Sequence, residues 1–465
     1  MATVPVINQQ LDTLNGKLDK QNALLEIMAA SSLESLKSDW EGLSLLADSG
    51  LFGDAYEIGT QFADTWTDVA NNNTEYTYPM QLNHVGDVEL EDGETLSNRP
   101  FLQAHYAHPF GVQFSHQRAF LMVAFKVASA LTSGSTYYFE RALDSKTISF
   151  KAPAAVSVGE WITLNNGNIE IYDTNGNLKY TTPATIGTGT TGTSLGASPT
   201  LAAGNYYFTH STSTVVSFTT TEQLEMGDRL GYWSSKVYPV TSDGKTVGTG
   251  LTTGTSTSGT DLGTLAANTR TTTGTYFLNG SNEMQYGWNR WKTSAIRQYL
   301  NSDGDVGAWW TAQDGFDIRP DEHLTKKGFL SGWDASIVAA LKPVKVTTYP
   351  NTVQDDTGGN TPDVTIDRVF LPSLEQIYAT PQKSGEGEYH EYWKRKVGLT
   401  SPMSQGGTYP NAITYAVEAH TTAVRVRLRS ASRGSSSNTW IVNSSGGVSY
   451  YGAYYSSRFS PLVVL

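Results

Sequence analysis

Hydrophobic positions near the N-terminus follow a helical spacing. Apolar residues alternate at intervals of three and four, with Gln21 as the one polar member of the series. The series consists of Val4, Ile7, Leu11, Leu14, Leu18, Leu25 and Met28. This spacing is typical of a coiled-coil seam and predicts an oligomerisation helix over residues 1–35. A helix lying on the surface of its own domain is the alternative, because only about three heptads are present.

The pattern becomes mixed over residues 36–135. Apolar residues between Trp40 and Leu51 predict a short helix that ends near Ser49 and Gly50. The run from Leu121 to Val127 is continuously apolar apart from Lys126 and predicts a buried strand. We therefore expect a mixed α/β N-terminal domain here.

Residues 136–275 contain an internal repeat. The run Thr136-Tyr137-Tyr138-Phe139 recurs as Asn205-Tyr206-Tyr207-Phe208, and Ile148-Ser149-Phe150 recurs as Val216-Ser217-Phe218. Alternating residues such as those of the run NIEIY, followed by the turn sequence DTNG, are typical of a strand and a hairpin. The pattern predicts two tandem all-β repeats. A spacer that lifts the last domain outward is the favoured role, and glycan-binding β-modules are the alternative.

The last block, residues 276–465, mixes helical and strand patterns. An amphipathic run over 286–302 predicts a helix, and a second helix is expected over 334–341. Strands are expected over 344–348 and over 423–428, where the alternation is typical of a half-buried strand. The predicted fold class is therefore α+β, mostly β.

The C-terminal end has an unusual composition. Between Asn443 and Arg458, 13 of 16 residues are Ser, Tyr, Gly or Asn, and the segment lies between the apolar runs WIV and PLVVL. Tyr offers a large rigid contact area, and Ser, Gly and Asn offer adaptable hydrogen bonds. A disordered tail is the alternative, but such tails are poor in aromatic residues. The segment is expected to form a binding surface.

Charge and composition exclude several classes of function. The formal net charge of −12 and the absence of basic clusters argue against binding to nucleic acid. The absence of cysteine removes disulfides and thiolate chemistry. No signal peptide or membrane-spanning run is evident, so synthesis in the cytoplasm without membrane insertion is expected.

Candidate catalytic and metal-binding groups are few. His105, His108 and His116 lie close in sequence, but their spacing matches no familiar ligand pair. The acidic run SGEGEYHEYW, with Glu386, Glu388 and Glu391, allows a glycosidase pair or, with Asp355, Asp356 and Asp363, a calcium site. Structural histidines and a solvated acidic loop are favoured, so no enzyme activity, cofactor or metal is predicted.

Four motifs carry a resemblance to a known family. They are NRWKTSAIRQYLNS, TIDRVFLPSLEQIY, VRLRSASRG and SRFSPLVVL. These motifs resemble the C-terminal C-type-lectin-like domain of bacteriophage variable proteins diversified by a diversity-generating retroelement. The resemblance covers about the last 190 residues and implies a fold that is also similar to formylglycine-generating enzymes. Since the enzymes of that fold rely on active-site cysteines, the lack of cysteine excludes their activity here.

The resemblance implies a variable region at about residues 430–458, within a ligand-binding domain spanning 276–465. Mutagenesis at adenines in Asn codons reaches the residue types that are enriched there. The implied ligand-binding positions are Ser432, Arg433, Ser435, Ser436, Ser437, Asn438, Asn443, Ser444, Ser449, Tyr450, Tyr451, Tyr454, Tyr455 and Ser456.

The sequence therefore predicts a phage virion protein for receptor binding or host adhesion. Its expected partners are a host cell-surface protein or glycan, other virion proteins, and further copies of itself, with a trimer as the guessed homo-oligomer. A structural virion decoration or spike without direct receptor binding is the alternative, and a carbohydrate-active enzyme is the least favoured hypothesis. The expected location is the virion, after synthesis in the host cytoplasm.

Overall fold

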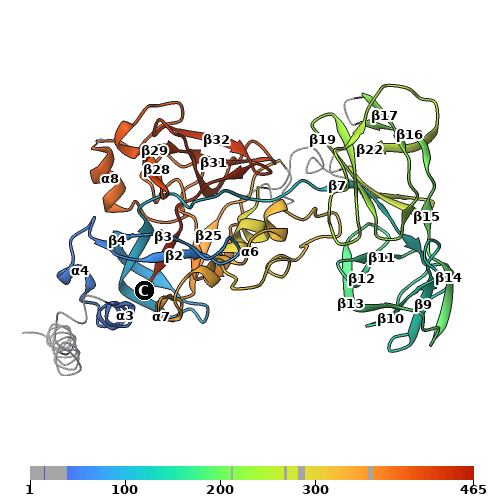
Figure 1. Cartoon of the computed structure of the whole chain (residues 1–465), viewed down its shortest axis with the longest axis horizontal. Helices are drawn as coiled ribbons and strands as arrows, with labels where there is room; N and C mark the ends of the chain where they lie inside the picture. Colours follow the sequence, from blue (N-terminus) through green and yellow to red (C-terminus); the bar gives the residue numbers. More distant parts are fainter. Residues whose placement is uncertain are drawn as a thin grey trace, which may run out of the picture.

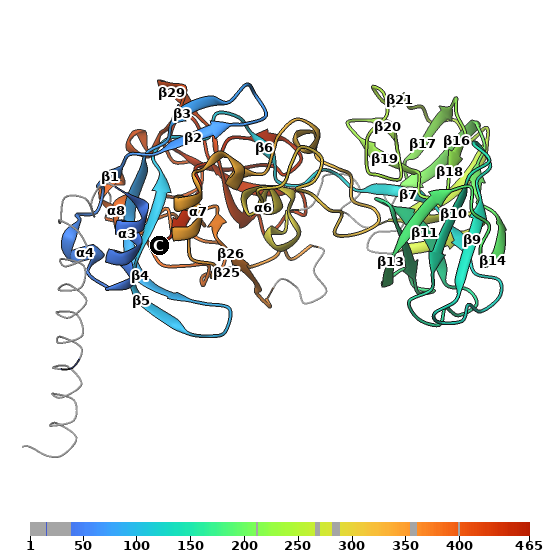
Figure 2. The same ribbon diagram turned by 60° about the horizontal axis from the view of Figure 1, so that its bottom comes forward.

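The computed structural model describes Asn15 and residues 39–210, 213–265, 270–280, 289–353, 360–398 and 400–465. Over these residues the protein is mostly β. Two lobes lie side by side along the long axis (Figure 1) and stay distinct when the view is turned (Figure 2). The seam residues predicted between Val4 and Met28 lie outside the described residues, so the coiled coil stays a prediction.

The first lobe contains segments from both ends of the described chain. Its helices are α3 (Trp40–Asp48), α4 (Phe52–Ala55), α6 (Ala295–Leu300), α7 (Ala335–Ala340) and α8 (Glu391–Val397), with the 3-10 turns η1 (Trp291–Thr293), η2 (Asp321–Leu324), η3 (Phe329–Gly332) and η4 (Pro410–Ala412). Its strands are β1 (Gln61–Phe62), β2 (Thr65–Asp68), β3 (Thr74–Thr77), β4 (Met80–Glu89), β5 (Thr95–Ala104), β6 (Val112–Gln113), β25 (Val344–Thr348), β26 (Asp363–Asp367), β27 (Val369–Phe370), β28 (Thr414–Ala416), β29 (Ala419–Val424), β30 (Val426–Ala431), β31 (Asn438–Val442), β32 (Val448–Gly452), β33 (Ser456–Ser457) and β34 (Leu462–Val464).

One five-stranded sheet joins the two ends of the chain, in the order β1-β4-β5-β34-β27. In β34, Val463 pairs with Leu102 on one side and with Val369 on the other. The hydrophobic core around this sheet contains residues from both ends of the described chain, including Trp40 and Leu465. The predicted domains 36–135 and 276–465 therefore differ from the observed arrangement, because their hydrophobic faces are buried against each other.

Helix starts in this lobe follow local capping chemistry. The Asp39 carboxylate accepts a hydrogen bond from the Gly42 amide at 2.7 Å, and α3 begins directly after Asp39. At α6, the Ser294 hydroxyl accepts from the Arg297 amide at 3.3 Å. Of the helix predicted over 286–302, residues 286–288 lie outside the described part, and the remainder contains η1 and the shorter α6. The helix expected over 334–341 corresponds to α7.

The second lobe contains the β-rich middle of the chain. Its strands are β7 (Ala119–Val123), β8 (Phe125–Lys126), β9 (Thr136–Glu140), β10 (Thr147–Lys151), β11 (Trp161–Asn165), β12 (Asn168–Tyr172), β13 (Leu178–Gly187), β14 (Thr193–Ala197), β15 (Thr200–Leu201), β16 (Gly204–His210), β17 (Val215–Thr220), β18 (Leu224–Glu225), β19 (Arg229–Trp233), β20 (Lys236–Val240), β21 (Leu251–Thr252), β22 (Thr260–Leu265), β23 (Arg270–Thr273) and β24 (Tyr276–Asn279).

Two units in this lobe have the same strand pairing. In the first, β9 pairs antiparallel with β10 and parallel with β14; in the second, β16 pairs antiparallel with β17 and parallel with β22. Gly192 and Gly259 hold equivalent places and have φ angles of +113° and +131°. A Cβ at either glycine would lie 2.4 Å from a backbone oxygen of β9 or β16. Both units therefore require glycine where the parallel strand approaches.

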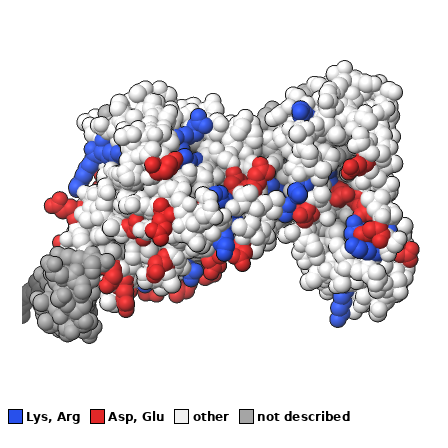
Figure 3. Space-filling view, viewed as in Figure 1, with Lys and Arg blue, Asp and Glu red and all other residues white. Residues whose placement is uncertain are grey.

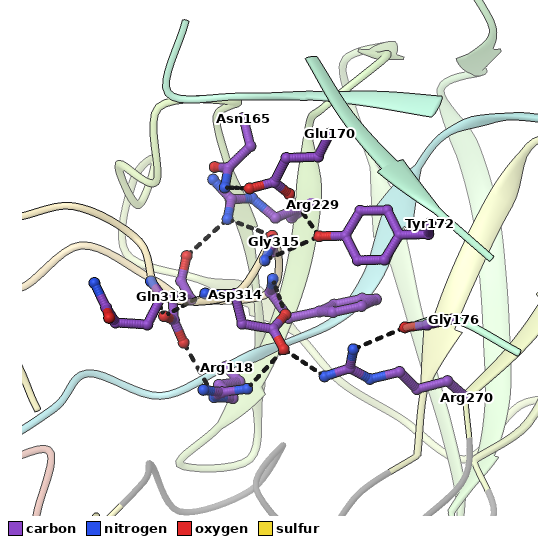
Figure 4. Close-up of polar contacts among 12 residues, drawn as sticks. Arg118, Asn165, Glu170, Tyr172, Gly176, Arg229, Arg270, Gln313, Asp314 and Gly315 are labelled. Atoms are coloured by element: carbon purple, nitrogen blue, oxygen red, sulfur yellow. Dashed lines mark hydrogen bonds and ion pairs between the residues drawn. The ribbon is translucent and has the colours of Figure 1, made fainter. Parts of the chain in front are cut away.

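A loop from the first lobe is buried against the second. This junction loop, residues 313–317, lies between α6 and η2 in sequence, and Phe316 packs with Met122, Trp161 and Phe277 at 0% exposure. Around it, the Asp314 carboxylate contacts Arg270 at 2.6 Å and Arg118 at 3.2 Å (Figure 4).

Ion pairs and hydrogen bonds connect the charged groups of the junction. Burial alone would raise the pKa of the Asp314 carboxyl, but Arg270 and Arg118 hold that pKa below its ordinary value. The Arg229 guanidinium donates to the carbonyl oxygens of Gly315 and Asp317, each at 2.7 Å. The junction loop thus fixes the second lobe to the first through one buried ring and a charged network.

We expect Phe316→Ala to lower the free energy of unfolding by about 3–5 kcal/mol, because it empties a fully buried site against the Phe277 ring. Urea unfolding measures the loss. The matched control is Leu143→Ala, since Leu143 is 57% exposed and its truncation should change stability by no more than about 0.5 kcal/mol. Equal effects of the two changes would show that the junction loop does not stabilise the protein.

Candidate ligand-binding face

The C-terminal tyrosines lie on a three-stranded sheet of order β30-β31-β32. One side of this sheet packs into a core that includes Val426, Trp440 and Val448. Because side chains alternate along a strand, Thr439 and its partner Tyr451 point to the opposite side. The sheet therefore has an inner apolar side and an outer side that carries Tyr451.

Aromatic rings and one guanidinium form a continuous stack on the outer side. The guanidinium carbon of Arg425 lies 4.0 Å from the centre of the Tyr451 ring. Tyr451 stacks with Tyr455 at 4.7 Å between ring centres, and Tyr455 contacts Tyr454 at 4.0 Å. Tyr455 is 43% exposed. We call Arg425, Ser449, Tyr451, Tyr454, Tyr455 and Ser456 the tyrosine face.

A buried arginine holds the turn behind this face. Arg427 is 0% exposed, and its guanidinium donates to the carbonyl oxygens of Gly452 at 3.0 Å and Tyr455 at 2.8 Å. It also donates to the Ser457 hydroxyl at 3.1 Å and contacts Thr439. Burial lowers the pKa of Arg427 to about 9, so the guanidinium is charged at neutral pH. Charged donors to several carbonyls fix the backbone of the turn.

The far end of the turn is attached to the N-terminal part of the chain. Strand β33 pairs with β6, and the Gln113 side-chain amide donates to the Tyr454 carbonyl at 2.8 Å. The Ser456 hydroxyl donates to the Glu322 carboxylate. Burial raises the pKa of Glu322, and the hydrogen bond from Ser456 partly opposes that effect. The tyrosine face is therefore held at both ends.

The structure separates the predicted contact residues into exposed and buried groups. Exposed or half-buried are Arg433, Ser435, Asn438, Asn443, Ser444, Ser449, Tyr450, Tyr451, Tyr454, Tyr455 and Ser456. Ser432, Ser436 and Ser437 are buried, at 6%, 6% and 8% exposure. These three serines differ from the expectation of a surface position, because they belong to the loop between β30 and β31, whose backbone is bonded by the buried Asn289.

Asn289, which the sequence did not single out, holds this loop. Its side-chain amide donates to the carbonyl oxygens of Ser435 at 2.6 Å and Asn438 at 2.7 Å. Its own side-chain oxygen accepts from the Asn351 amide at 2.8 Å. A buried asparagine that bonds several carbonyls gives no local sequence signal.

Two further predicted contacts have local structural roles. The Asn443 side-chain oxygen accepts from the amides of Ser445 and Gly447, both at 2.9 Å, and so shapes the hairpin between β31 and β32. Tyr450 lies on the inner side of the sheet with its ring 6.0 Å from Trp440, although it is 48% exposed. The tyrosine face itself excludes both residues.

The strand predicted over 423–428 was expected to be half-buried, but β30 is buried throughout. Arg429, at 2% exposure, donates to the Leu371 carbonyl at 2.7 Å and contacts Gln376. The spacing of two residues between Arg427 and Arg429 was a usable signal, because alternate residues of a strand point to the same side.

The histidines and acidic residues considered for chemistry lie in separate environments. His108 is buried among aromatic rings that include Trp66 and Phe459, and burial lowers its pKa well below the ordinary value. Burial also lowers the pKa of His105 and of His116 to about 4. Within the described ranges, no group of three or more His, Cys, Asp or Glu could hold a metal ion.

The acidic loop is used for structural contacts. Glu386 is buried, accepts from the Tyr349 amide at 2.8 Å and contacts the Ser430 hydroxyl. Glu388 lies 3.5 Å from His84, and Glu391 lies 3.5 Å from Arg395 within α8. Asp363 binds Arg290 at 2.7 Å, whereas Asp355 and Asp356 lie outside the described residues.

Comparisons with known proteins give one match. A family model described as a domain of unknown function, DUF6273, matches residues 269–462. The matched segment contains the junction loop and the tyrosine face, but not β4 and β5. No curated protein and no solved structure matches the chain. Among the helices that the structure describes, none is long and apolar enough to cross a membrane.

We expect Arg427→Met to lower the free energy of unfolding by at least about 2 kcal/mol, because several buried carbonyls would lose a charged donor. Urea unfolding provides the measurement. Arg425→Met is the matched control on the same side of the sheet; only a stacking contact is lost, so the change should stay below about 1 kcal/mol. Similar losses for both variants would contradict the role assigned to Arg427.

Proposed function

We propose that this protein is a phage virion protein for receptor binding or host adhesion, and that the tyrosine face contacts a host cell-surface protein or glycan. The observation that carries the proposal is the stack of Arg425, Tyr451, Tyr455 and Tyr454 held over the buried Arg427. No catalytic role and no cofactor are proposed.

The fixed backbone of the face supports a binding role. Association costs free energy when loops and side chains become ordered on binding. Here the turn after β32 is already held by Arg427, by Gln113 and by the pairing of β33 with β6. Tyr side chains add large contact areas with few rotatable bonds. The face can therefore bind a ligand with a small entropic cost.

The separation between replaceable and fixed positions supports a diversified protein. Side chains at Tyr451 and Tyr455 lie outside the apolar cores, whereas Trp440 and Val448 belong to one. Substitutions at the first pair leave core packing unchanged, and substitutions at the second pair create cavities. This division fits a variable region on a C-type-lectin-like domain, of the kind diversified by a retroelement.

Multivalency would strengthen weak contacts. The proposed N-terminal coiled coil would bring several faces together in a homo-oligomer, for which we propose a trimer. Linked sites raise overall affinity by roughly 10²–10⁴ when they engage simultaneously. Modest affinity at one face is therefore sufficient for adhesion.

We expect the double variant Tyr451→Ala/Tyr455→Ala to weaken host-cell binding by about 30-fold or more, which is the loss typical of residues that dominate an interface. Flow cytometry with the labelled full chain measures binding, and thermal unfolding checks that the variant is folded. The matched control is Tyr138→Ala/Tyr207→Ala, at equivalent half-buried positions of β9 and β16.

Cell binding by the Tyr451→Ala/Tyr455→Ala variant and its incorporation into phage particles together separate adhesion from a purely structural role in the virion. Unchanged cell binding by the Tyr451/Tyr455 variant would refute adhesion through this face. If that variant instead failed to enter phage particles while other virion proteins assembled, the decoration or spike alternative would be favoured.

The retroelement part of the proposal has its own test. We expect the DNA near the coding region for residues 430–458 to contain a second, near-identical copy that differs from it only at adenines of the copy. Sequencing of the flanking DNA shows this directly. A genome without such a copy would remove the diversification mechanism and leave the adhesion proposal standing.

A further inference from the structure

Arg425 is an exposed cation on an acidic protein. The chain has a formal net charge of −12, and Figure 3 shows acidic side chains gathered along the lower edge of the first lobe. Arg458 and Arg395 have carboxylate partners in Glu418 and Glu391. Within the part of the chain that the structure describes, no carboxylate forms an ion pair with Arg425.

The stack fixes the position of this guanidinium. The guanidinium carbon lies 4.0 Å from the centre of the Tyr451 ring. The Tyr455 ring stacks on Tyr451 with 4.7 Å between the ring centres. Stacking on an aromatic ring leaves the N–H donors at the edge of a guanidinium available. Those donors match the two oxygens of a carboxylate. Arg425 is therefore prepared to bind a carboxylate.

A second guanidinium strengthens the local positive charge. Arg427 lies 5.9 Å from the centre of the same Tyr451 ring and is buried beneath it. The Glu322 carboxylate is the nearby acidic group; it is buried and accepts a hydrogen bond from the Ser456 hydroxyl. Tyr451 is thus flanked by two cations in a protein whose overall charge is negative.

The other groups of the face favour a ligand rich in hydroxyls. Tyr451 lies between Arg425 and Tyr455, so its two flat faces are covered. The ring edges and phenolic hydroxyls of Tyr451 and Tyr455 face a ligand, together with the hydroxyl of the half-buried Ser449. Hydroxyl groups bind sugar hydroxyls well because each can donate and accept.

We propose that the tyrosine face recognises a carboxylate-bearing glycan, in which Arg425 binds the carboxylate and the hydroxyls of Tyr451, Tyr455 and Ser449 bind the sugar. Arg425 is not among the positions implied by the variable region. This proposal depends on the proposed function in one respect: both place the ligand on the tyrosine face.

An array of acidic glycans, each printed beside its methyl ester, tests the ligand class with the full chain. The ester keeps the sugar and removes the charge. We expect binding to the acids, and a loss of between about 10-fold and 100-fold both for the esters and for Arg425→Gln, because each removes a charge-assisted hydrogen-bonded pair. Arg425→Lys should retain part of the binding, since it keeps the charge but loses the paired donors.

Arg395→Gln is the matched control, because Arg395 is an exposed arginine that pairs with Glu391 on α8. This variant should bind the acids as the unchanged protein does. Equal binding to acids and esters, or full binding by Arg425→Gln, would overturn the proposal. Binding to oligoglutamate that depends on Arg425, without binding to any acidic glycan, would also overturn it in favour of an acidic protein ligand.

Cell binding keeps the two proposals distinguishable. If Tyr451→Ala/Tyr455→Ala abolishes host-cell binding and Arg425→Gln does not, the face is the adhesion site and its ligand lacks the carboxylate. If neither change affects cell binding, adhesion through this face is wrong. A loss in both variants, together with preference for acids on the array, supports both proposals.

Discussion

The pairing of β34 between β5 and β27 is the constraint on which the rest of the first lobe depends. The last strand is buried along its length, and the Leu465 carbonyl accepts from Arg99 at 2.5 Å. Because β33 precedes it by a few residues, this pairing also sets where the turn of the tyrosine face can lie. The tyrosine face therefore lies at the edge of the first lobe's core. Strand pairing, rather than the tyrosine side chains, holds its backbone in place.

The second lobe is an insertion between segments that complete the first. Its entry strand β7 and its exit strand β24 pair with each other, with Tyr276 opposite Val123. An insertion whose ends lie together can be added without separating the strands of the host core. The junction loop then fixes the orientation of the inserted lobe by burying Phe316. This arrangement gives the repeats a defined direction relative to the tyrosine face.

Buried arginines connect folding and proposed function. Arg427 and Arg429 each bind backbone carbonyls from distant segments, and neither reaches solvent. Arg425 directly precedes β30 and is exposed, and its guanidinium stacks on the Tyr451 ring. Residues two apart in sequence thus supply the arginine that fixes the turn and the cation that we assign to the ligand.

The sequence by itself determined the local elements: the helix after Asp39, the hairpin after Tyr172, the repeated strand pattern and the apolar frame around the tyrosines. These depend on neighbours within a few residues, such as the Asp173 carboxylate that accepts from the Asn175 amide at 2.8 Å. Only the tertiary structure decided that β5 and β34 share a sheet, that Ser432 is buried, and that Arg427 rather than Arg425 lies inside. Strand partners and the burial of polar groups depend on residues hundreds of positions away. The spacing of hydrophobic residues along the chain does not specify which distant residues these are.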